Sequence, residues 1–369
     1  MAHDKNKLTA PLAGDQENTF SGDVTYLAPL PFPTLRPAKD YGKTIGKMTE
    51  TYADFGGGWP SAFVMQYAFG MPLTWFAITL ILFPLSIVIN IYIGGESLSR
   101  ALGFFFFYMP GGEVYVIGAL AFLCALYARN KALLALEETI PPRFNRQRRE
   151  VCFIVEDIDE PIFVPWESLT AWVSEARHRQ HGSTLRYFSM GFGFYHAPSA
   201  QRLALECPCA SLTIATSKWE AIRAYMEYEV HTLSDIDPQD GLHNPDDPPH
   251  EGLHTFYNAK AEMKRQFRER EVGVFYVMGW YLYHVMTLWT LAHRITEYDV
   301  RQLKLNKPKV LPQALIDWSE SLPPEQWAKP SAELLKQSAQ ARALHELYPD
   351  ASTGQLFACV QALQTPADS

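Results

Sequence analysis

LTWFAITLILFPLSIVINIYI, residues 73–93, is the stretch that decides the fold class, because none of its 21 residues is charged. As a helix it rises about 31 Å, and the hydrocarbon core of a bilayer is roughly 30 Å thick. Pro84 predicts a kink rather than a break, because lipid-facing backbone can satisfy its hydrogen bonds only within a helix. This stretch therefore predicts a membrane-spanning helix.

A second apolar run follows closely. VYVIGALAFLCALYA, residues 114–128, carries no charge, and extending it back to Pro110, which suits the first turn of a helix, predicts a second span at about 110–128. The aromatic run Phe104–Tyr108 is typical of an interfacial belt or a re-entrant loop. Residues 71–130 are therefore predicted to form a two-helix transmembrane hairpin.

Basic residues orient this hairpin. The connection between the spans contains Arg100 alone, whereas six basic residues follow the second span. The positive-inside rule therefore places both termini in the cytoplasm, and no cleavable signal segment precedes the spans. We expect a multi-pass protein of the bacterial inner (cytoplasmic) membrane. The six basic residues are Arg129, Lys131, Arg143, Arg146, Arg148 and Arg149.

The overall composition, by contrast, is that of a soluble protein. The 369 residues have a mean hydropathy of −0.12 and a formal net charge of −8. These averages combine an almost uncharged hairpin with an acidic remainder. The acidic balance argues against nucleic acid as a partner, since nucleic-acid binding needs a basic surface.

A cytoplasmic α+β domain is predicted over residues 143–232. Short β-branched and aromatic runs predict strands, the CPC sequence at 207–209 is typical of a turn, and an amphipathic helix at 218–230, capped by Ser217, closes the sheet. The strands are expected at 151–155, 161–165, 185–195, 202–207 and 210–215. The other segments are an irregular Pro-rich cytoplasmic arm (1–70), an acidic Pro-rich loop (233–252), a long helix (253–298) and a helical or irregular tail (299–369) with a short helix expected at 332–348.

The apolar stretch 272–292 inside the predicted long helix leaves two interpretations open. It has no formal charge, and five basic residues lie on each side of it, so its flanks give no orientation. Its Trp and Tyr residues and His284 suit a helix that lies at the membrane interface or is buried in protein. A third crossing would instead place the tail outside the cell.

Two resemblances bear on function. RFNRQRREV (143–151), with VPWE (164–167) and AWV (171–173), is similar to a family of uncharacterised bacterial membrane proteins associated with type VI secretion and polymorphic-toxin loci. That resemblance implies an immunity or accessory protein for a secreted effector, and it implies no catalytic residues. Strands followed by one helix beside a membrane hairpin also resemble membrane-anchored bacterial pleckstrin-homology-like (PH-like) domains, in which Trp166 would lie on a short strand.

Motifs for catalysis are not found. The sequence contains no hydrolase elbow, metalloprotease helix, kinase loop or dinucleotide fingerprint, so we expect neither an enzyme nor a cofactor. Cys207 and Cys209 lack a second pair that would complete a metal site. His243, His250 and His254 have spacings that fit neither a helical zinc site nor a calcium loop, so we interpret them as part of a hydrophilic loop.

The strongest charged feature, the arginine cluster at 143–149, is therefore the candidate site. Its basic residues could be an orientation signal with salt bridges to Glu150 and other acids, or could attract anionic lipid headgroups, and both roles are compatible. The expected function is binding of a cognate toxin at the membrane, and the alternative is a membrane-tethered PH-like adaptor or regulator that binds anionic lipid or a protein partner. Oligomeric state is not indicated. The candidate contact residues are Arg143, Arg146, Arg148, Arg149 and Trp166.

Overall fold

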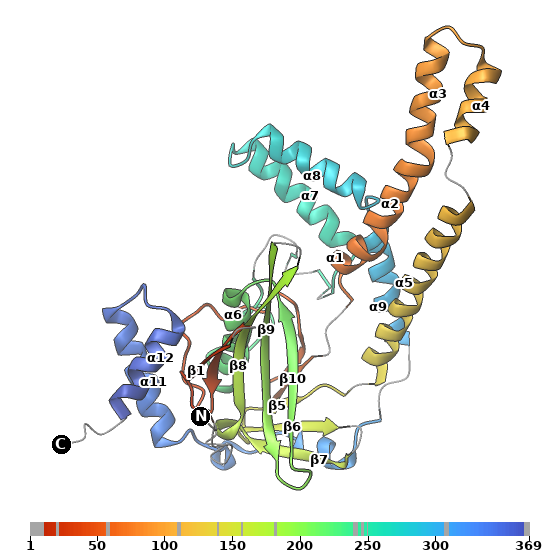
Figure 1. The fold of residues 1–369 in the computed structure, drawn as a ribbon. Helices are drawn as coiled ribbons and strands as arrows, with labels where there is room; N and C mark the ends of the chain where they lie inside the picture. Colours follow the sequence, from red (N-terminus) through yellow and green to blue (C-terminus); the bar gives the residue numbers. More distant parts are fainter. Residues whose placement is uncertain are drawn as a thin grey trace, which may run out of the picture. The chain divides into compact units, whose positions relative to one another are not determined.

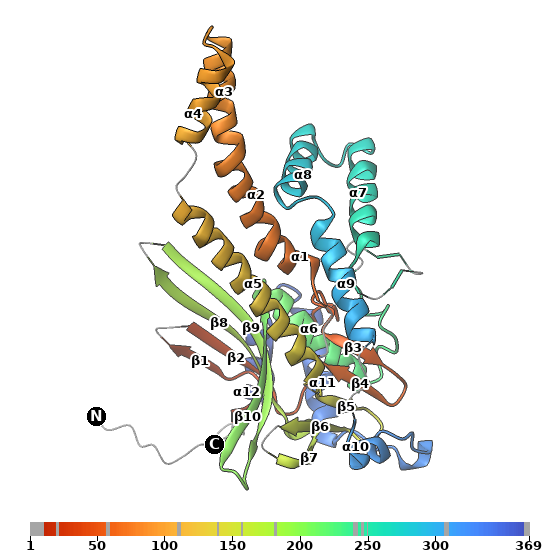
Figure 2. The same cartoon turned by 90° about the vertical axis from the view of Figure 1, so that its right-hand side faces the viewer.

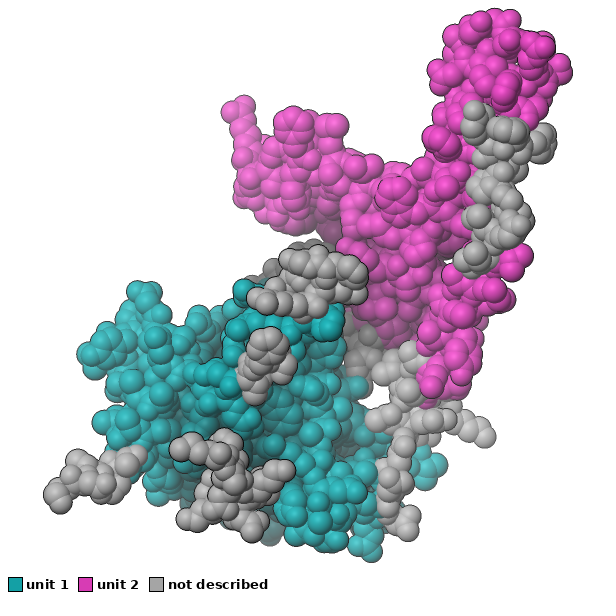
Figure 3. All heavy atoms as spheres, in the orientation of Figure 1, with its two compact units in different colours: residues 1–58, 140–238, 310–369 teal, residues 59–139, 239–309 magenta. Residues whose placement is uncertain are grey.

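The structure is a computed structural model, and it consists of two compact units (Figures 1 and 3). Unit 1 comprises residues 1–58, 140–238 and 310–369, and unit 2 comprises residues 59–139 and 239–309. Residues 143–232 therefore do not form a domain by themselves, because unit 1 also includes segments from both ends of the chain. The described residues are 11–19, 22–56, 60–108, 112–138, 140–155, 158–180, 183–238, 243–244, 247–248, 250–305 and 310–364.

The described part of unit 1 contains two antiparallel five-stranded sheets. Sheet A has the strand order β1-β2-β8-β9-β10, and sheet B has the order β3-β4-β5-β6-β7. The strands of sheet A are β1 Gln16–Thr19, β2 Gly22–Ala28, β8 Thr170–Gln180, β9 Ser183–His196 and β10 Gln201–Cys209. Those of sheet B are β3 Ile45–Met48, β4 Tyr52–Phe55, β5 Arg143–Asn145, β6 Glu150–Val155 and β7 Ile158–Pro165.

The N-terminal segment is not the irregular arm that its composition predicts. Strand β2 pairs with β8, with Tyr26 opposite Trp172, and β4 pairs with β5, with Ala53 opposite Phe144. These strands are short, and their partners β8 and β5 lie far away in the sequence, so local alternation gives little signal. Residues 1–10 of the expected arm lie outside the described part of the chain.

One helix covers sheet A, as expected, but it begins earlier than predicted. Helix α6, Leu212–Met226, contacts β8, β9 and β10, and its N-cap Ser211 accepts a hydrogen bond from the Ile214 amide at 3.2 Å. The predicted strand at 210–215 and the cap at Ser217 are therefore wrong. The predicted turn at 207–209 is wrong too, because these residues continue β10, an edge strand in which Pro208 is tolerated.

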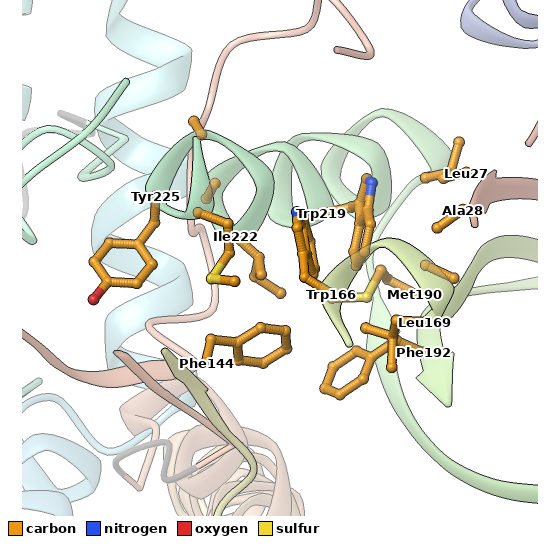
Figure 4. Close-up of a cluster of buried hydrophobic side chains, with 14 of the residues drawn as sticks. Leu27, Ala28, Phe144, Trp166, Leu169, Met190, Phe192, Trp219, Ile222 and Tyr225 are labelled. Carbon is orange, nitrogen blue, oxygen red and sulfur yellow. The ribbon is translucent and has the colours of Figure 1, made fainter. Parts of the chain in front are cut away.

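Aromatic side chains fill the core between α6 and the sheets (Figure 4). Trp166 and Trp219 stack with ring centroids 5.3 Å apart, and neither is exposed to solvent. The Phe192 ring of sheet A contacts the rings of Phe55 and Phe144 of sheet B, with ring centroids 5.2 and 5.3 Å apart. The same rings therefore belong to the core of both sheets.

The C-terminal tail packs onto this core. Helix α11, Ala332–Leu347, forms where the sequence predicts a helix, and α12, Thr353–Gln364, places Phe357 4.0 Å from Phe32 between ring centroids. Phe357 is fully buried. The tail is thus part of unit 1, and the short helices α10, Gln313–Trp318, and η4, Pro324–Gln326, precede its helical pair.

Unit 2 is built on a continuous helix that begins at Ala62 and ends at Ile93. Two π-helical turns interrupt its α-helical geometry, and each ends just before a proline, Pro72 or Pro84. A proline ring clashes with the carbonyl four residues earlier, and the wider π turn lies where that carbonyl is. The segments are α1 Ala62–Met65, η1 Gln66–Gly70, α2 Met71–Ala77, η2 Ile78–Leu82 and α3 Phe83–Ile93.

The second half of the predicted hairpin differs from expectation. The chain turns at Gly94–Gly95, and Phe104–Tyr108 belong to helix α4, Leu98–Tyr108, which packs along α3 instead of forming a loop (Figures 1 and 2). Helix α5, Gly112–Glu138, follows. Pro110 and Gly111 of the predicted second span lie outside the described residues. Within the described chain, one helix, Ala62–Ile93, is long and apolar enough to cross a membrane.

The predicted long helix at 253–298 is broken into three. These are α7 Leu253–Arg268, α8 Val274–Met286 and α9 Leu291–Leu305. Arg270, Leu288 and Trp289 adopt left-handed backbone conformations, with φ of 58–61°, and they interrupt the helix at both breaks. Helix α8 has 13 residues and is about 20 Å long, so stretch 272–292 does not form a helix that crosses a bilayer.

Candidate functional site

The arginine-rich motif forms the turn between β5 and β6. Arg143, at the start of β5, donates two hydrogen bonds to Asp54 of β4 at 2.6 and 2.9 Å, and one to Ser319 Oγ at 2.8 Å. Its guanidinium also lies 3.9 Å from the centre of the Tyr52 ring. Arg143 therefore joins sheet B to the C-terminal segment.

Arg146 is completely buried within unit 1. Its Nε donates to the Glu50 carbonyl at 2.9 Å, its Nη1 donates to the Val230 carbonyl at 3.2 Å, and its Nη2 pairs with the Glu50 carboxylate. The guanidinium lies over the rings of Tyr225 and Tyr228, at 4.8 and 4.6 Å. Burial raises the pKa of Tyr225.

Arg149 and Trp166 share one acceptor. Arg149 Nη1 and Nη2 donate to Glu227 at 3.0 and 2.8 Å, and the Trp166 indole N–H donates to the same carboxylate at 3.0 Å. Nη2 of Arg149 also lies 3.1 Å from Glu167. The φ of Arg149 is 52°, so the turn places this side chain at a backbone cost that the surrounding contacts must offset.

The turn also binds the C-terminal segment. Arg148 Nε and Asn145 Nδ2 both donate to the Trp318 carbonyl, at 2.9 and 3.0 Å. Gln147 accepts from the Leu322 amide at 2.7 Å. The motif therefore joins all three chain segments of unit 1.

This geometry corrects the expected lipid or partner contact. Arg143, Arg146, Arg149 and Trp166 are at most 7% exposed, and Arg148, although half-buried, is bonded to Trp318. Buried guanidinium groups held by protein acceptors cannot reach lipid headgroups. The motif does form salt bridges, but not with the neighbouring Glu150. The acids that pair with it are distant in the sequence, so the motif alone does not identify them: Glu50, Asp54, Glu167 and Glu227.

A second buried charge network was missed by the sequence analysis. Glu220 of α6 accepts from the Thr34 amide and hydroxyl at 2.9 and 2.6 Å and pairs with Arg223. Arg223 also pairs with Glu229, which accepts from Arg342 of α11 at 2.8 Å. The i, i+3 spacing of Glu220 and Arg223 was the only local signal.

Histidines gather in unit 2 around Phe256 of α7. The Phe256 ring lies 5.2 Å from that of His284 and 5.5 Å from that of His293, and His254 lies 5.6 Å from His243. Burial lowers the pKa of His293 to about 4. In the part of the chain that the structure describes, no group of three or more His, Cys, Asp or Glu side chains is arranged to hold a metal ion.

Side-chain contacts within unit 2 join the long helix to the end of α8, and α5 to α9. Tyr283 donates to Gln66 Oε1 at 2.8 Å, and Gly70 packs so closely that a β-carbon there would lie 2.7 Å from the Thr287 carbonyl oxygen. Arg129 of α5 pairs with Asp299 of α9, whose side chain is fully buried. These contacts join the helices of unit 2 in two places, the long helix to α8 and α5 to α9.

The outer face of sheet A, opposite α6, exposes large side chains. Leu185, Tyr187 and Tyr195 of β9 lie on this face and are 43%, 58% and 67% exposed. Trp172 lies against Gly191 in the middle of the face, where a β-carbon would come within 2.5 Å of the indole ring. This face of unit 1 therefore exposes aromatic side chains.

Comparisons of the chain with protein-family models, with curated proteins and with solved structures find no match. Function is therefore argued from the geometry of the two units.

Proposed function

We propose that the chain is a non-enzymatic protein of a bacterial cytoplasmic membrane, anchored by helices α1–α5, whose unit 1 binds a protein partner. The observation that carries the proposal is the surface of the helix Ala62–Ile93. Its large apolar side chains point outward, with Trp75, Ile81, Leu82 and Phe83 52–59% exposed. Exposing such a surface to water would be strongly unfavourable, at about 25 cal/mol per Å².

The membrane hairpin that we propose has a different tip from the one expected. Helix α4 returns along α3, and Gly118 of α5 lies against Phe76, so the descending half combines α4 and α5. The turn around Glu96 would lie outside the cell, with Glu96 and Arg100 paired at 2.9 Å. Both termini and unit 1 would lie in the cytoplasm.

The proposed partner is a toxic effector, and the protein would act as its immunity or accessory protein. The resemblance to proteins of type VI secretion loci suggests this class of partner. We place the contact on the outer face of sheet A, because exposed tyrosines are typical of binding surfaces and Tyr187 and Tyr195 are 58% and 67% exposed there. The expectation that the arginine motif contacts the partner is not retained.

Co-expression with a candidate effector from the neighbouring genes tests the proposal. The wild-type chain should protect a sensitive host, and Tyr187→Asp with Tyr195→Asp should abolish protection, because a charge would enter the contact. Tyr41→Asp, at a similarly exposed site of unit 1, is the matched control and should protect fully. Killing that is unchanged by the wild-type chain would refute the proposed function.

A further inference from the structure

Helix α8 exposes an apolar stripe. Phe275, Met278, Leu282 and Val285 recur at spacings of three and four residues, which places them on one side of the helix. They are 89%, 60%, 62% and 57% exposed. Nothing charged lies between Val272 and Ala292.

The other side of α8 is occupied by α7. Trp280 and His284 of α8 lie 5.7 and 5.2 Å from Phe256 of α7, and the two helices lie side by side in both views (Figures 1 and 2). Helix α7 is charged, and Lys264 and Arg268 are exposed on it. The α7–α8 hairpin therefore has one polar and one apolar surface.

This apolar surface continues from the anchor. Helix α8 contacts α2, and Tyr283 of α8 is bonded to Gln66, at the beginning of the long apolar helix. Residues 66–70 precede the stretch 73–93, so α8 joins the anchor at the level where it would enter the bilayer. In the turn before α8, Arg270 is exposed, and so are Glu269 and Glu271 on either side of it.

From these contacts we infer that α8 is an interfacial helix that lies in the cytoplasmic leaflet of the same membrane, with its 275–278–282–285 stripe in the acyl region and α7 on the water side. The inference rests on the proposed anchor. A helix of about 20 Å cannot cross the hydrocarbon core, but it can lie along the headgroup boundary. The occupant of the stripe is therefore lipid.

Site-specific photocrosslinking in the full-length chain, in native membranes, tests this inference. Benzoylphenylalanine replaces Met278 in the test variant, Ile81 in the anchor control and Lys264 in the aqueous control, and the readout is crosslinked phospholipid. We expect positions 278 and 81 to crosslink at least about tenfold more than position 264.

The controls separate two failures. Strong crosslinking at position 81, while position 278 crosslinks no more than position 264, would overturn the interfacial helix and leave the anchor intact. Weak crosslinking at all three positions would overturn the anchor, and the inference with it.

A second measurement does not depend on photochemistry. Met278→Glu with Leu282→Glu places two charges on exposed positions, so unit 2 should still fold. In inside-out vesicles these changes should speed trypsin cleavage at Arg270 about fivefold or more, because the hairpin leaves the headgroup region. Lys264→Glu is the matched control. Equal cleavage of all three proteins would contradict the inference.

Discussion

Replacing Arg149 with Met tests whether the arginine motif holds unit 1 together. The change removes contacts of 2.8 and 3.0 Å to Glu227 and of 3.1 Å to Glu167. The Glu227 carboxylate, 15% exposed, keeps only the Trp166 N–H among these partners. Removing one partner of a buried pair costs about 3–5 kcal/mol. For a unit of about 200 residues this lowers Tm by roughly 6–20 °C.

Thermal unfolding of the full-length protein in mild detergent, followed by tryptophan fluorescence, measures this loss. Trp166 and Trp219 stack beside the pair, so their emission reports on the site. Arg177→Met is the matched control: Arg177 pairs with Asp23 and Glu175 but is 44% exposed, so its loss should change Tm little. Equal Tm shifts for Arg149→Met and Arg177→Met would refute the structural role of the motif.

Three further predictions concern buried groups. Burial lowers the pKa of His293 from 6.5 to about 4, so the folded state favours the neutral ring. The free energy of unfolding should therefore be highest above pH 6.5 and should fall by about 3 kcal/mol as the pH drops to 4. Hydrogen exchange in α9 should show this loss, and His293→Phe should flatten it. Gly70→Val should destabilise unit 2 by about 1–3 kcal/mol, because its β-carbon would meet the Thr287 carbonyl; unchanged Tm would contradict this packing. Burial raises the pKa of the Cys152 thiol to about 12, so a maleimide at pH 7 should label the exposed Cys359 and leave Cys152 unmodified until the protein unfolds.

Elements with a strong local pattern could be predicted from the sequence. The apolar helix that contains 73–93, strand β6 and helix α11 form where periodicity and composition place them. Each of these elements carries its signal within its own residues. The break at 287–290 had no such signal, because Leu288 and Trp289 rarely adopt left-handed backbone conformations.

The role of the arginine motif could not be predicted, because it depends on distant pairing. Arg146 finds Glu50 and Val230, which lie far from it in both directions along the chain. Four clustered cations beside a membrane segment suggest a surface patch when their partners are unknown. The prediction of an irregular Pro-rich arm was wrong for the same reason. Its strands β2 and β4 form because they pair with β8 and β5, and their own residues carry little strand signal.

Cysteine labelling in intact cells tests the proposed anchor most directly. Glu96→Cys places a thiol at the turn between α3 and α4, and the loss of the exposed pair with Arg100 costs little. A maleimide that cannot cross the cytoplasmic membrane should label this variant in intact cells, whereas the wild-type chain, with its exposed Cys359 in unit 1, should be labelled only after permeabilisation. Labelling of Glu96→Cys only after permeabilisation, or of the wild-type chain in intact cells, would contradict the transmembrane hairpin.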